Sequence, residues 1–412
     1  MNFVIRKTAK NILLTPKFLW KFSRISGQIK LGVIFGGSSV EHEISVISAL
    51  QAIEHINKEK YEVIPIYIGK NRVWYTSPLL LDIKNYKDLD LLTKNCRSIS
   101  LCKKDNEFHL ISTKGLLNKT VDKIDVAFPI VHGQNVEDGT LAGYLDTIGI
   151  PYVGSNTLAS AIGQDKVIIK EILKSNNIPV VDYTWFYDTE FEDNQSDILK
   201  DIKKIGYPVV VKPASLGSSV GINFVKNEKT IIDAITEALE YDKKIVVEKA
   251  VDNLIEVNCS VLGNYEDAKA SVIEQVSTDN DLLTFDDKYT GSGKSKGIVN
   301  TSRIIPAKIS KDLTDKIKNT SLEVFRCLNF SGVVRIDYLI DSKSNKYYVN
   351  EPNTIPGSLS FYLWEKTELD YTKLLDDLIT IGIRDYKNKQ KKQFSFDTNV
   401  LKNFNGLKGM KK

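Results

Sequence analysis

Two carboxylates and an amide near the end of the chain have the residue types and spacing of a metal site. Asp337 lies in VVRIDYLID, and Glu351 and Asn353 lie in KYYVNEPN, on the other side of the turn-rich SKSNK. A hairpin over these segments brings Asp337 to within about one residue of facing Glu351, with Asn353 on the same strand face. Hard oxygen ligands of this kind suit Mg²⁺ held jointly with substrate phosphates. The alternative is a solvated sheet face.

Arg335 lies two residues before Asp337 and therefore points to the same face of the predicted hairpin. Its guanidinium either stabilises an anion or pairs with the two acids.

A second candidate is the segment YPVVVKPASLGSSVGINFV (207–225), in which a strand runs into Lys212 and a loop of small residues follows. Small residues let backbone N–H groups approach phosphate oxygens, and the hydroxyls of Ser215, Ser218 and Ser219 add donors. The segment lacks the GxxxxGK[ST] pattern, and a strand follows instead of a helix, so it is not a Walker A loop. A plain hairpin turn is the alternative.

A third candidate is IVVEKA (245–250), a predicted strand that carries Glu248 and Lys249, with Glu256 nearby. Such a strand can present backbone and carboxylate to the amino group of adenine, while a second acid holds ribose hydroxyls. Exposed Glu–Lys pairs are common, so a solvated strand is the alternative.

Two loops have the properties of substrate sites. GGSSVEHEISVIS (36–48) ends a strand and opens a helix, with Glu41 and Glu43 near the helix N-terminus, but it does not match GxGxxG and gives no support to a nicotinamide role. Acids at that position also serve as simple partners of the helix dipole. HGQNVEDGT (132–140) places His132 in a loop after a predicted strand, where α/β proteins bind ligands.

The surrounding elements predict how these residues are positioned. From Lys30 onward, a strand, a glycine turn, a helix and a strand indicate an α/β unit with a parallel sheet, and hairpins mixed with helices after residue 156 indicate α+β structure. The predicted segments are a basic extension (1–29), an N-terminal α/β substrate domain (30–155), a central subdomain (156–250), a C-terminal subdomain (251–386) and a basic tail (387–412).

Taken in order along the chain, these motifs resemble those of the D-alanine–D-alanine ligases of the ATP-grasp superfamily. The resemblance covers about residues 30–385 and rests on GGSSVEHEIS, HGQNVEDGT, PYVGS, DK (165–166), VVKPASLGSSVG, VVEK, KY (288–289), VVRID and NEPNTIPG. It implies a three-domain ATP-grasp fold with ATP between the central and C-terminal subdomains.

The resemblance also implies roles for individual residues. Those that hold ATP and its phosphates are Lys166, Lys212, Ser219, Glu248, Lys249, Glu256 and Lys288. The magnesium or manganese ligands, for two ions, are Asp337, Glu351 and Asn353. Those that bind the amino acids or act in catalysis are Glu41, His132, Ser218, Tyr289, Arg335, Gly357, Tyr362 and Leu363.

The implied reaction joins two D-alanines into D-alanyl-D-alanine for peptidoglycan synthesis. One carboxylate attacks the γ-phosphate of ATP to form an acyl phosphate, and the amine of the second amino acid displaces phosphate. Segment 284–303 is the candidate lid that excludes water. Tyr362 stands where the family usually has a serine that holds the second substrate. The alternatives are therefore a ligase with another acceptor, such as D-lactate, D-serine or another amino acid, or a non-catalytic nucleotide-binding relative.

Composition bounds the location and the partners. The net charge of +4 combines a segment of +7 in residues 1–30, a segment of +7 in residues 387–412 and a body of −10, which argues against nucleic-acid binding by the body. Four cysteines form no disulfide framework and no run of 18 apolar residues occurs, which favours a cytoplasmic protein. The resemblance implies a homodimer. For the basic, aromatic N-terminal extension, a weak membrane-surface contact is one hypothesis, and a disordered or partner-binding tail is the alternative.

Overall fold

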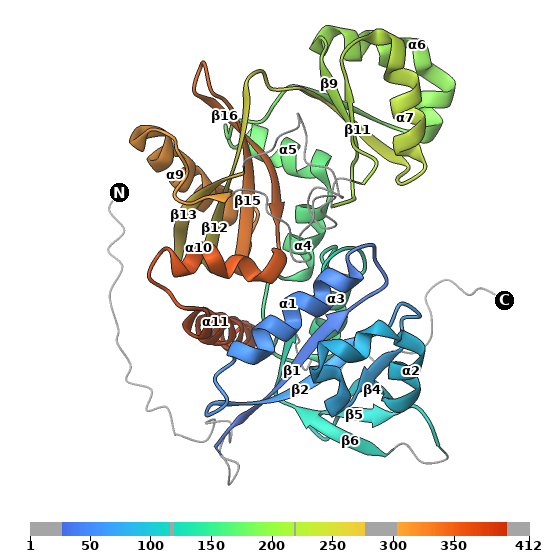
Figure 1. Ribbon diagram of the computed structural model, residues 1–412, viewed down its shortest axis with the longest axis vertical. Helices are drawn as coiled ribbons and strands as arrows, with labels where there is room; N and C mark the ends of the chain where they lie inside the picture. The colour runs from blue at the N-terminus through green and yellow to red at the C-terminus, as the bar shows by residue number, and fades with distance from the viewer. Residues whose placement is uncertain (1–26, 116–118, 218–219, 277–302, 394–412) are drawn as a thin grey trace, which may run out of the picture.

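The computed structural model describes residues 27–115, 119–217, 220–276 and 303–393. Within these residues the strands form three separate sheets of seven, four and five strands. Figure 1 shows them as three bodies, with the seven-stranded sheet at the bottom, the four-stranded sheet at the upper right and the five-stranded sheet at the left. The fold is the mixed α/β and α+β architecture that the sequence predicts.

The seven-stranded sheet has the strand order β6-β5-β4-β3-β2-β1-β7. Its β1 pairs in parallel with β2 and β7, as the strand–helix–strand pattern predicts, while β3 to β6 add antiparallel pairs. The strands are β1 (Ile29–Gly36), β2 (Tyr61–Ile68), β3 (Trp74–Thr76), β4 (Arg97–Lys104), β5 (Glu107–Ser112), β6 (Thr120–Ile124) and β7 (Val126–Pro129).

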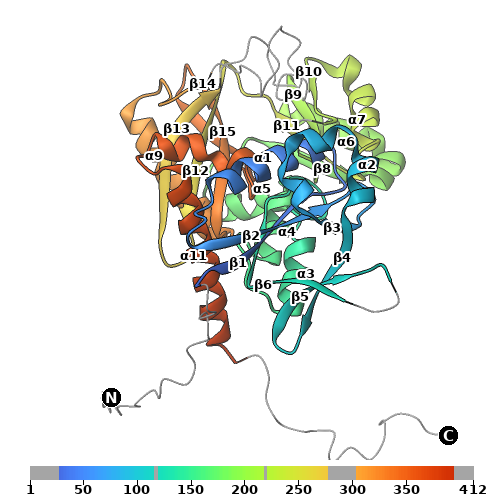
Figure 2. The same ribbon diagram turned by 60° about the horizontal axis from the view of Figure 1, so that its bottom comes forward.

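Helix α1 (His42–His55) begins six residues after β1 and covers one face of this sheet together with α11 (Tyr371–Gln390). Buried Val46 and Ala49 of α1 pack in one core with Leu374 and Leu378 of α11. This core also takes in side chains of the five-stranded sheet, so α11 joins the two bodies, as Figures 1 and 2 show. Helices α2 (Leu89–Asn95) and α3 (Thr140–Ile148) and the short 3₁₀ turns at Pro78–Leu81 and Ile83–Lys87 complete the body.

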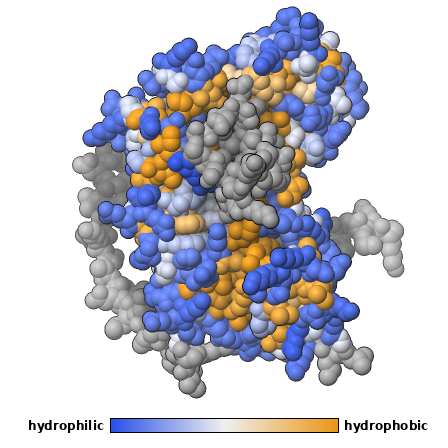
Figure 3. Space-filling view, in the orientation of Figure 1, coloured by the Kyte–Doolittle hydropathy of each residue, from blue (hydrophilic) through white to orange (hydrophobic). Residues whose placement is uncertain are grey.

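The surface of this N-terminal body carries several large exposed apolar side chains near the 3₁₀ turns and α2. They are Leu79, Leu81, Ile83 and Leu91, and their exposed fractions lie between 43% and 57%. Figure 3 shows hydrophobic residues gathered over the lower body, on the face it presents.

The four-stranded sheet is antiparallel, in the order β10-β9-β11-β8. It consists of β8 (Tyr183–Tyr187), β9 (Val209–Pro213), β10 (Asn223–Val225) and β11 (Lys244–Lys249), and α6 (Asp188–Ile205) and α7 (Ile231–Leu239) pack against it. Strand β9, which precedes the small-residue loop, and strand β11, which carries Glu248 and Lys249, are neighbours in this sheet. Their pairing sets Val246 opposite Lys212 and Glu248 opposite Val210.

The five-stranded sheet has the order β14-β13-β12-β15-β16 and is also antiparallel. Its strands are β12 (Leu254–Gly263), β13 (Ala268–Val276), β14 (Arg303–Ile304), β15 (Gly332–Asp341) and β16 (Lys346–Asn353). The predicted hairpin over VVRIDYLID and KYYVNEPN is confirmed as β15–β16.

Helices α4 (Thr157–Gln164), α5 (Lys166–Ser175) and α9 (Lys311–Cys327) pack on the five-stranded sheet, and α10 (Phe361–Glu365) follows the 3₁₀ turn Gly357–Ser360. The first two precede the four-stranded sheet in sequence, yet Ile169 and Leu173 share a core with Ile317 and Val324 of α9. The domain boundaries drawn from sequence stay predictions. Among the described helices, none has both the length and the apolar character needed to cross a membrane, and all four cysteines are unpaired.

Candidate active site

The metal-ligand candidates lie together on the β15–β16 hairpin. Asp337 is directly opposite Glu351, and Arg335 is opposite Asn353, so all four side chains share one face of the sheet. The Arg335 guanidinium donates two hydrogen bonds to Asp337, with Nε 2.7 Å from Oδ1 and Nη2 2.8 Å from Oδ2. Asn353 Nδ2 donates to Asp337 Oδ2 at 3.1 Å. The predicted register, which set Asp337 within about one residue of Glu351, is confirmed, and a register shift between Asp337 and Tyr338 brings the two residues directly opposite each other.

Lysine side chains approach this hairpin from α5. The Lys166 ammonium lies 3.2 Å from Glu351 Oε2 and donates to the carbonyl of Leu216 in the loop after β9. Its backbone N–H donates to the carbonyl of Ala214 at 2.9 Å, and Gln164 Nε2 donates to the carbonyl of Ser215 at 2.8 Å. The start of α5 is thus fastened to the small-residue loop, which places Lys166 between that loop and the hairpin.

A small cavity, of about 40 Å³, lies where the three bodies meet. It is lined by side chains and backbone from all three, including Glu41, Glu137, Lys166, Gly217, Glu351 and Asn353. Two of the three sequence-predicted metal ligands (Glu351 and Asn353), one predicted ATP ligand (Lys166) and the predicted amino-acid ligand Glu41 therefore line one space.

The donor set of the hairpin fits a magnesium ion that also binds phosphate. Asp337, Glu351 and Asn353 supply two carboxylates and one amide, and the two carboxylates are now paired with Arg335 and Lys166, which provide the positive charge that the acids require. Within the described ranges, no group of three His, Cys, Asp or Glu side chains is arranged to hold a metal unaided.

A buried charge cluster lies beside this hairpin, beneath the small-residue loop. Glu248 of β11 is 1% exposed, and its Oε2 accepts from Lys212 Nζ at 2.8 Å while its Oε1 lies 3.0 Å from Lys170 Nζ. Lys212 also donates to Asn350 Oδ1 at 3.1 Å. Burial opposes ionisation of Glu248, but the charges of Lys170 and Lys212 lower its pKa to about 2.

The same charges act on Lys212. Burial alone would lower the pKa of the Lys212 ammonium, but the carboxylates of Glu248, Glu351 and Glu256 raise it above the ordinary value. Lys212 therefore stays cationic at neutral pH, as a phosphate ligand must, and Glu256 lies close enough to contribute.

Lys249 points away from this cluster. Neighbouring residues on a strand face opposite ways, and its ammonium donates to the carbonyls of Gly206 and Tyr207 at 3.1 and 3.0 Å. The structure thus brings Lys166, Lys212, Glu248 and Glu256 together but not the Lys249 ammonium.

Two loops at the carboxyl ends of β1 and β7 hold the substrate candidates Glu41 and His132. Glu41 caps α1, is 8% exposed, and its Oε2 lies near Gly133 and Gly217, where an added Cβ would come within 3.1 and 3.7 Å of that oxygen. Ser39 Oγ donates to the carbonyl of His132 at 2.8 Å, which ties the two loops together.

Both ring nitrogens of His132 already have partners. Nδ1 donates to the carbonyl of Ile355 at 2.7 Å, and Nε2 accepts from Ser48 Oγ at 3.0 Å. Burial lowers the pKa of His132, so the ring is neutral. In this arrangement His132 orients the loop after β16 against α1.

Glu137 was missed by the reading of the sequence. Its Oε2 accepts from the backbone N–H of Gly133 at 2.6 Å, and burial, together with the neighbouring charge of Glu41, raises its pKa to about 8. The motif HGQNVEDGT contains this residue, but nothing in the pattern distinguishes it from Asp138. Lys170 was missed as well, although it lies one turn after Lys166 on the buried face of α5.

The turn after β16 carries the last candidates. An added Cβ at Gly357 would meet no atom within 4 Å, so the backbone there borders open space. The Tyr362 hydroxyl donates to Glu274 Oε1 at 2.9 Å. Leu363 is fully buried, and its carbonyl accepts from Thr367 Oγ1 at 2.7 Å. The predictions for Ser218, Ser219, Lys288 and Tyr289, and for all but the last residue of lid segment 284–303, lie outside the described residues.

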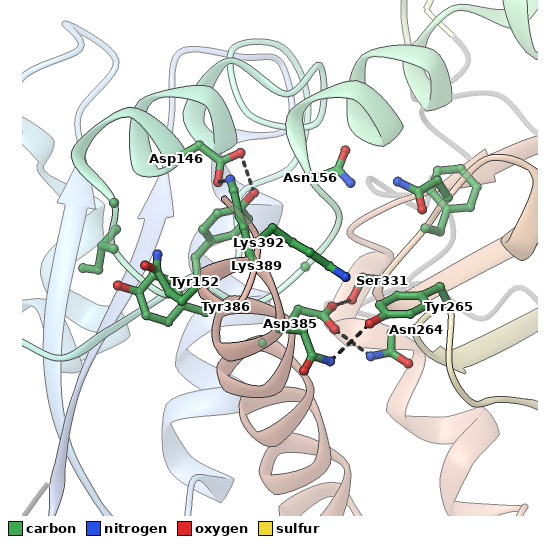
Figure 4. A pocket seen from close by; sticks show the side chains of 18 residues that line it. Asp146, Tyr152, Asn156, Asn264, Tyr265, Ser331, Asp385, Tyr386, Lys389 and Lys392 are labelled. Carbon is green, nitrogen blue, oxygen red and sulfur yellow. Dashed lines mark hydrogen bonds and ion pairs between the residues drawn. The ribbon is translucent and has the colours of Figure 1, made fainter. Parts of the chain in front are cut away.

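A second, larger cavity of about 370 Å³ lies away from this site, at the junction of α3, α11 and the β12–β13 turn (Figure 4). Its polar side chains pair with one another: Lys389 Nζ lies 2.6 Å from Asp146 Oδ1, Tyr152 OH donates to Asp146 Oδ2 at 3.2 Å, and Asn264 Nδ2 donates to Asp385 Oδ1 at 2.6 Å. These pairs join the bodies to one another, and none of the predicted site residues lines this cavity.

Comparison with known proteins gives one consistent result. Two family models match the chain: "D-ala D-ala ligase N-terminus" over residues 30–155 and "D-ala D-ala ligase C-terminus" over residues 172–380. A D-alanine–D-alanine ligase from Thermosipho melanesiensis is 42% identical over 375 residues, which are 91% of this chain and 98% of the relative. One from Bacillus cytotoxicus is 36% identical over 383 residues, with 89% and 99% covered.

Solved structures agree. The D-alanine–D-alanine ligase from Coxiella burnetii has a TM-score of 0.73 at 29% identity, covering 88% of this chain and 96% of that one. A D-Ala:D-Ser ligase from Enterococcus faecalis has a TM-score of 0.73 at 28% identity, with 86% and 99% covered. The D-alanine–D-alanine ligase from Bacillus anthracis, in complex with ATP, has a TM-score of 0.62 at 26% identity, with 88% and 99% covered.

Proposed function

The chain belongs to the D-alanine–D-alanine ligase family, and on that premise we propose that it uses ATP to join two D-alanine molecules into D-alanyl-D-alanine for peptidoglycan synthesis. The observation that carries the proposal is the convergence of Glu41, Lys166, Glu351 and Asn353 on one cavity. An acceptor for an amino group, cations for phosphate and oxygen ligands for a metal thus face each other within a single space.

In the proposed mechanism, ATP lies between the four- and five-stranded sheets. Lys212 and Lys166 are the phosphate ligands, because both are buried ammonium groups at the mouth of the small-residue loop. Glu248 and Glu256 face the same space as carboxylate partners of the nucleoside. Lys212 now pairs with Glu248 and Asn350, and its ammonium has a third N–H with which it can bind phosphate.

Asp337, Glu351 and Asn353 are the proposed ligands of two Mg²⁺ or Mn²⁺ ions. When bound, these ions neutralise charge on the transferring phosphate. Arg335 and Lys166 pair with Asp337 and Glu351 and orient these acids, which offsets the cost of partly burying two carboxylates.

The first D-alanine places its ammonium at Glu41, one of two acids of the N-terminal body that line the cavity; the other, Glu137, has a pKa raised to about 8. Its carboxylate attacks the γ-phosphate and becomes an acyl phosphate, and the amine of the second D-alanine then attacks the acyl carbon. The proposed donors to the oxyanion of the tetrahedral intermediate are the Arg335 guanidinium and the Gly357 backbone. The chain contributes mainly by positioning and by charge stabilisation.

The test is an assay with ATP, Mg²⁺ and a panel of D- and L-amino acids and D-hydroxy acids, in which phosphate release and product mass are both measured. Formation of D-alanyl-D-alanine as the main product supports the proposal, and product with only another acceptor contradicts it. ATP binding without turnover of any pair would favour a non-catalytic relative.

The metal assignment is tested by Asp337→Asn. The amide keeps the side-chain shape but removes the charge, so we expect turnover to be abolished and not restored except at much higher Mg²⁺. Asp197→Asn is the matched control, since Asp197 is an exposed residue of α6 paired only with surface lysines. Near-normal turnover of Asp337→Asn at ordinary Mg²⁺ would refute the assignment.

We also propose a homodimer in the cytoplasm. The exposed apolar side chains of the N-terminal body (Leu79, Leu81, Ile83 and Leu91) are candidates for the dimer contact, because large apolar patches on a folded surface commonly mark interfaces. Sedimentation of the wild type and of Leu91→Lys tests the dimer contact.

A weak membrane-surface contact by residues 1–28 is tested by liposome co-sedimentation of the chain with and without these residues. Equal pelleting of the two forms rejects the contact.

A further inference from the structure

The row of polar side chains on the five-stranded sheet continues beyond the metal-ligand candidates. Asn258 of β12 is opposite Asp337 on one side and opposite Glu274 of β13 on the other. Side chains that face each other across strands project from the same side of a sheet. Asn258 Nδ2 accordingly donates to Glu274 Oε1 at 2.8 Å. One row therefore runs from Glu351 through Asp337 and Asn258 to Glu274.

At the far end of this row, Arg303 is stacked on an aromatic ring. The Arg303 guanidinium carbon lies 4.2 Å from the centroid of the Tyr362 ring, within the range of a cation–π contact. Its Nη1 lies 3.8 Å from Glu274 Oε2, which is an ion pair without a hydrogen bond. The Tyr362 hydroxyl donates to the other oxygen of Glu274. Glu274 and Tyr362 thus hold the guanidinium in one place from two sides.

This arrangement leaves the guanidinium able to bind an anion. The Arg303 side chain is 39% exposed, and none of its N–H groups donates a hydrogen bond within the part of the chain that the structure describes. Glu274 is 1% exposed, and its Oε2 accepts no hydrogen bond from the described residues. The planar fork of a guanidinium matches a carboxylate in two hydrogen bonds, and its two flanking partners already fix its plane.

The position of Arg303 relative to the reaction centre follows from the register. Glu274 is two strands away from Asp337, which corresponds to about 10 Å across the sheet. Arg335 is close enough to both ends for its charge to interact with Tyr362 and Glu274 as well as with Asp337. On the proposed metal assignment the phosphates lie over Asp337 and Glu351, so we assign the opposite end of the row, at Glu274 of β13, to the amino acid that attacks last.

We propose that Arg303, seated on the Tyr362 ring and held by Glu274, binds the carboxylate of the second amino acid and thereby selects an acceptor that carries one. Tyr362 and Glu274 are positioning residues in this account, because they act through the guanidinium. The inference rests on the proposed ligase function. It also gives a physical reason for a tyrosine at position 362: its hydroxyl is committed to Glu274, while its ring supports the cation.

The experiment compares two acceptors, D-alanine and D-alaninamide, which differ only in the carboxylate. Arg303→Met keeps the length of the side chain but removes the charge and the fork. A charge-assisted pair of hydrogen bonds contributes enough that we expect the acceptor KM for D-alanine to rise at least about tenfold. The KM for ATP should stay unchanged, and the preference for D-alanine over D-alaninamide should fall by the same factor.

Further variants separate positioning from folding. Arg303→Lys keeps the charge and should recover part of the preference, and Tyr362→Phe keeps the ring and should retain more of it than Tyr362→Leu. Arg97→Met on β4 removes an exposed arginine of the N-terminal sheet and is the matched control. Equal thermal unfolding of the variants and the wild type excludes a general folding defect.

The outcomes are distinguishable from those of the proposed function. If the wild type is active and Arg303→Met changes neither the acceptor KM nor the acceptor preference, this inference is wrong, while the proposed function is unaffected. A wild type that uses a different carboxylate-bearing acceptor refutes D-alanine as second substrate, and the same comparison with that acceptor still decides the role of Arg303. A specific loss of the carboxylate preference in Arg303→Met supports the proposal.

Discussion

Three consecutive residues in the turn beside the site adopt left-handed backbone conformations without being glycine. Ser358, Leu359 and Ser360 have φ values of +49°, +54° and +52°. An L-residue in this region costs roughly 1–2 kcal/mol. The turn is held in place by Ser358, whose N–H donates to Ser48 Oγ at 3.0 Å and whose hydroxyl donates to Gln51 Oε1 at 2.6 Å, both on α1. Strain here is therefore offset by contacts with another body.

Ser360 allows this strain to be measured. It is fully buried, and its hydroxyl has no hydrogen-bond partner among the described residues. Ser360→Ala removes the hydroxyl but keeps the backbone cost. Ser360→Gly removes both, and it gains roughly 1–2 kcal/mol from the relieved conformation while losing about 0.5–1 kcal/mol to the greater entropy of glycine in the unfolded chain. We therefore expect the glycine variant to be more stable than the alanine variant by roughly 0.5–1 kcal/mol.

The assay is thermal unfolding of the two variants side by side, where this difference corresponds to roughly 0.5–1 °C in Tm for a chain of this length. The sign of the stability difference is the decisive result, because at ordinary helical positions a glycine variant is less stable than the alanine variant by about 1 kcal/mol. Thr236→Ala and Thr236→Gly, at an exposed position of α7, serve as that control pair. If Ser360→Gly melts below Ser360→Ala, the strain argument is wrong.

Two further predictions concern buried charges. In Lys170→Met, Glu248 loses one of its two cations; because the folded pKa of Glu248 is lowered to about 2, its contribution to stability is present above pH 4.5 and is lost as pH falls towards 2. We expect this loss of stability to begin at a higher pH in the variant, and the KM for ATP to rise. Lys174→Met, at an exposed position, should show neither change in pH-dependent melting and kinetics. In Glu137→Gln, a neutral amide replaces a carboxyl whose folded pKa is raised from 4.5 to about 8. The stability of the variant relative to wild type should therefore grow from near zero at pH 4.5 to at most about 5 kcal/mol at pH 8. A difference in Tm that stays flat across this range would contradict the protonated state of this half-buried side chain.

Much of the site could be predicted because it depends on local periodicity. Side chains alternate along a strand, so the turn-rich SKSNK predicts that Asp337 lies within about one residue of facing Glu351, with Asn353 on the same strand face. The structure has Asp337 directly opposite Glu351 after a register shift between Asp337 and Tyr338. In the same way, a strand that ends in glycines and is followed by an amphipathic helix places Glu41 at a helix start beside the carboxyl end of a parallel sheet.

Other features could not be predicted because their partners are distant in sequence. Lys170 is one turn after Lys166, but only the packing of α5 against the five-stranded sheet makes it a fully buried partner of Glu248, which lies 78 positions along the chain. His132 has the sequence context of a ligand, yet its ring nitrogens are occupied by Ser48 and the carbonyl of Ile355. No local pattern encodes such pairings.

The sequence by itself determined the types and spacing of the chemical groups, the strand register of the metal ligands to within about one residue, and the resemblance that indicates the reaction. The tertiary structure decided which of these groups face each other and which side chains are held for another purpose, such as the Lys249 ammonium on two backbone carbonyls. It also placed Arg303 on the ring of Tyr362, 59 positions further along the chain. The physical reason is range: periodicity acts over a few residues, whereas burial and charge pairing depend on how three separate sheets pack against one another.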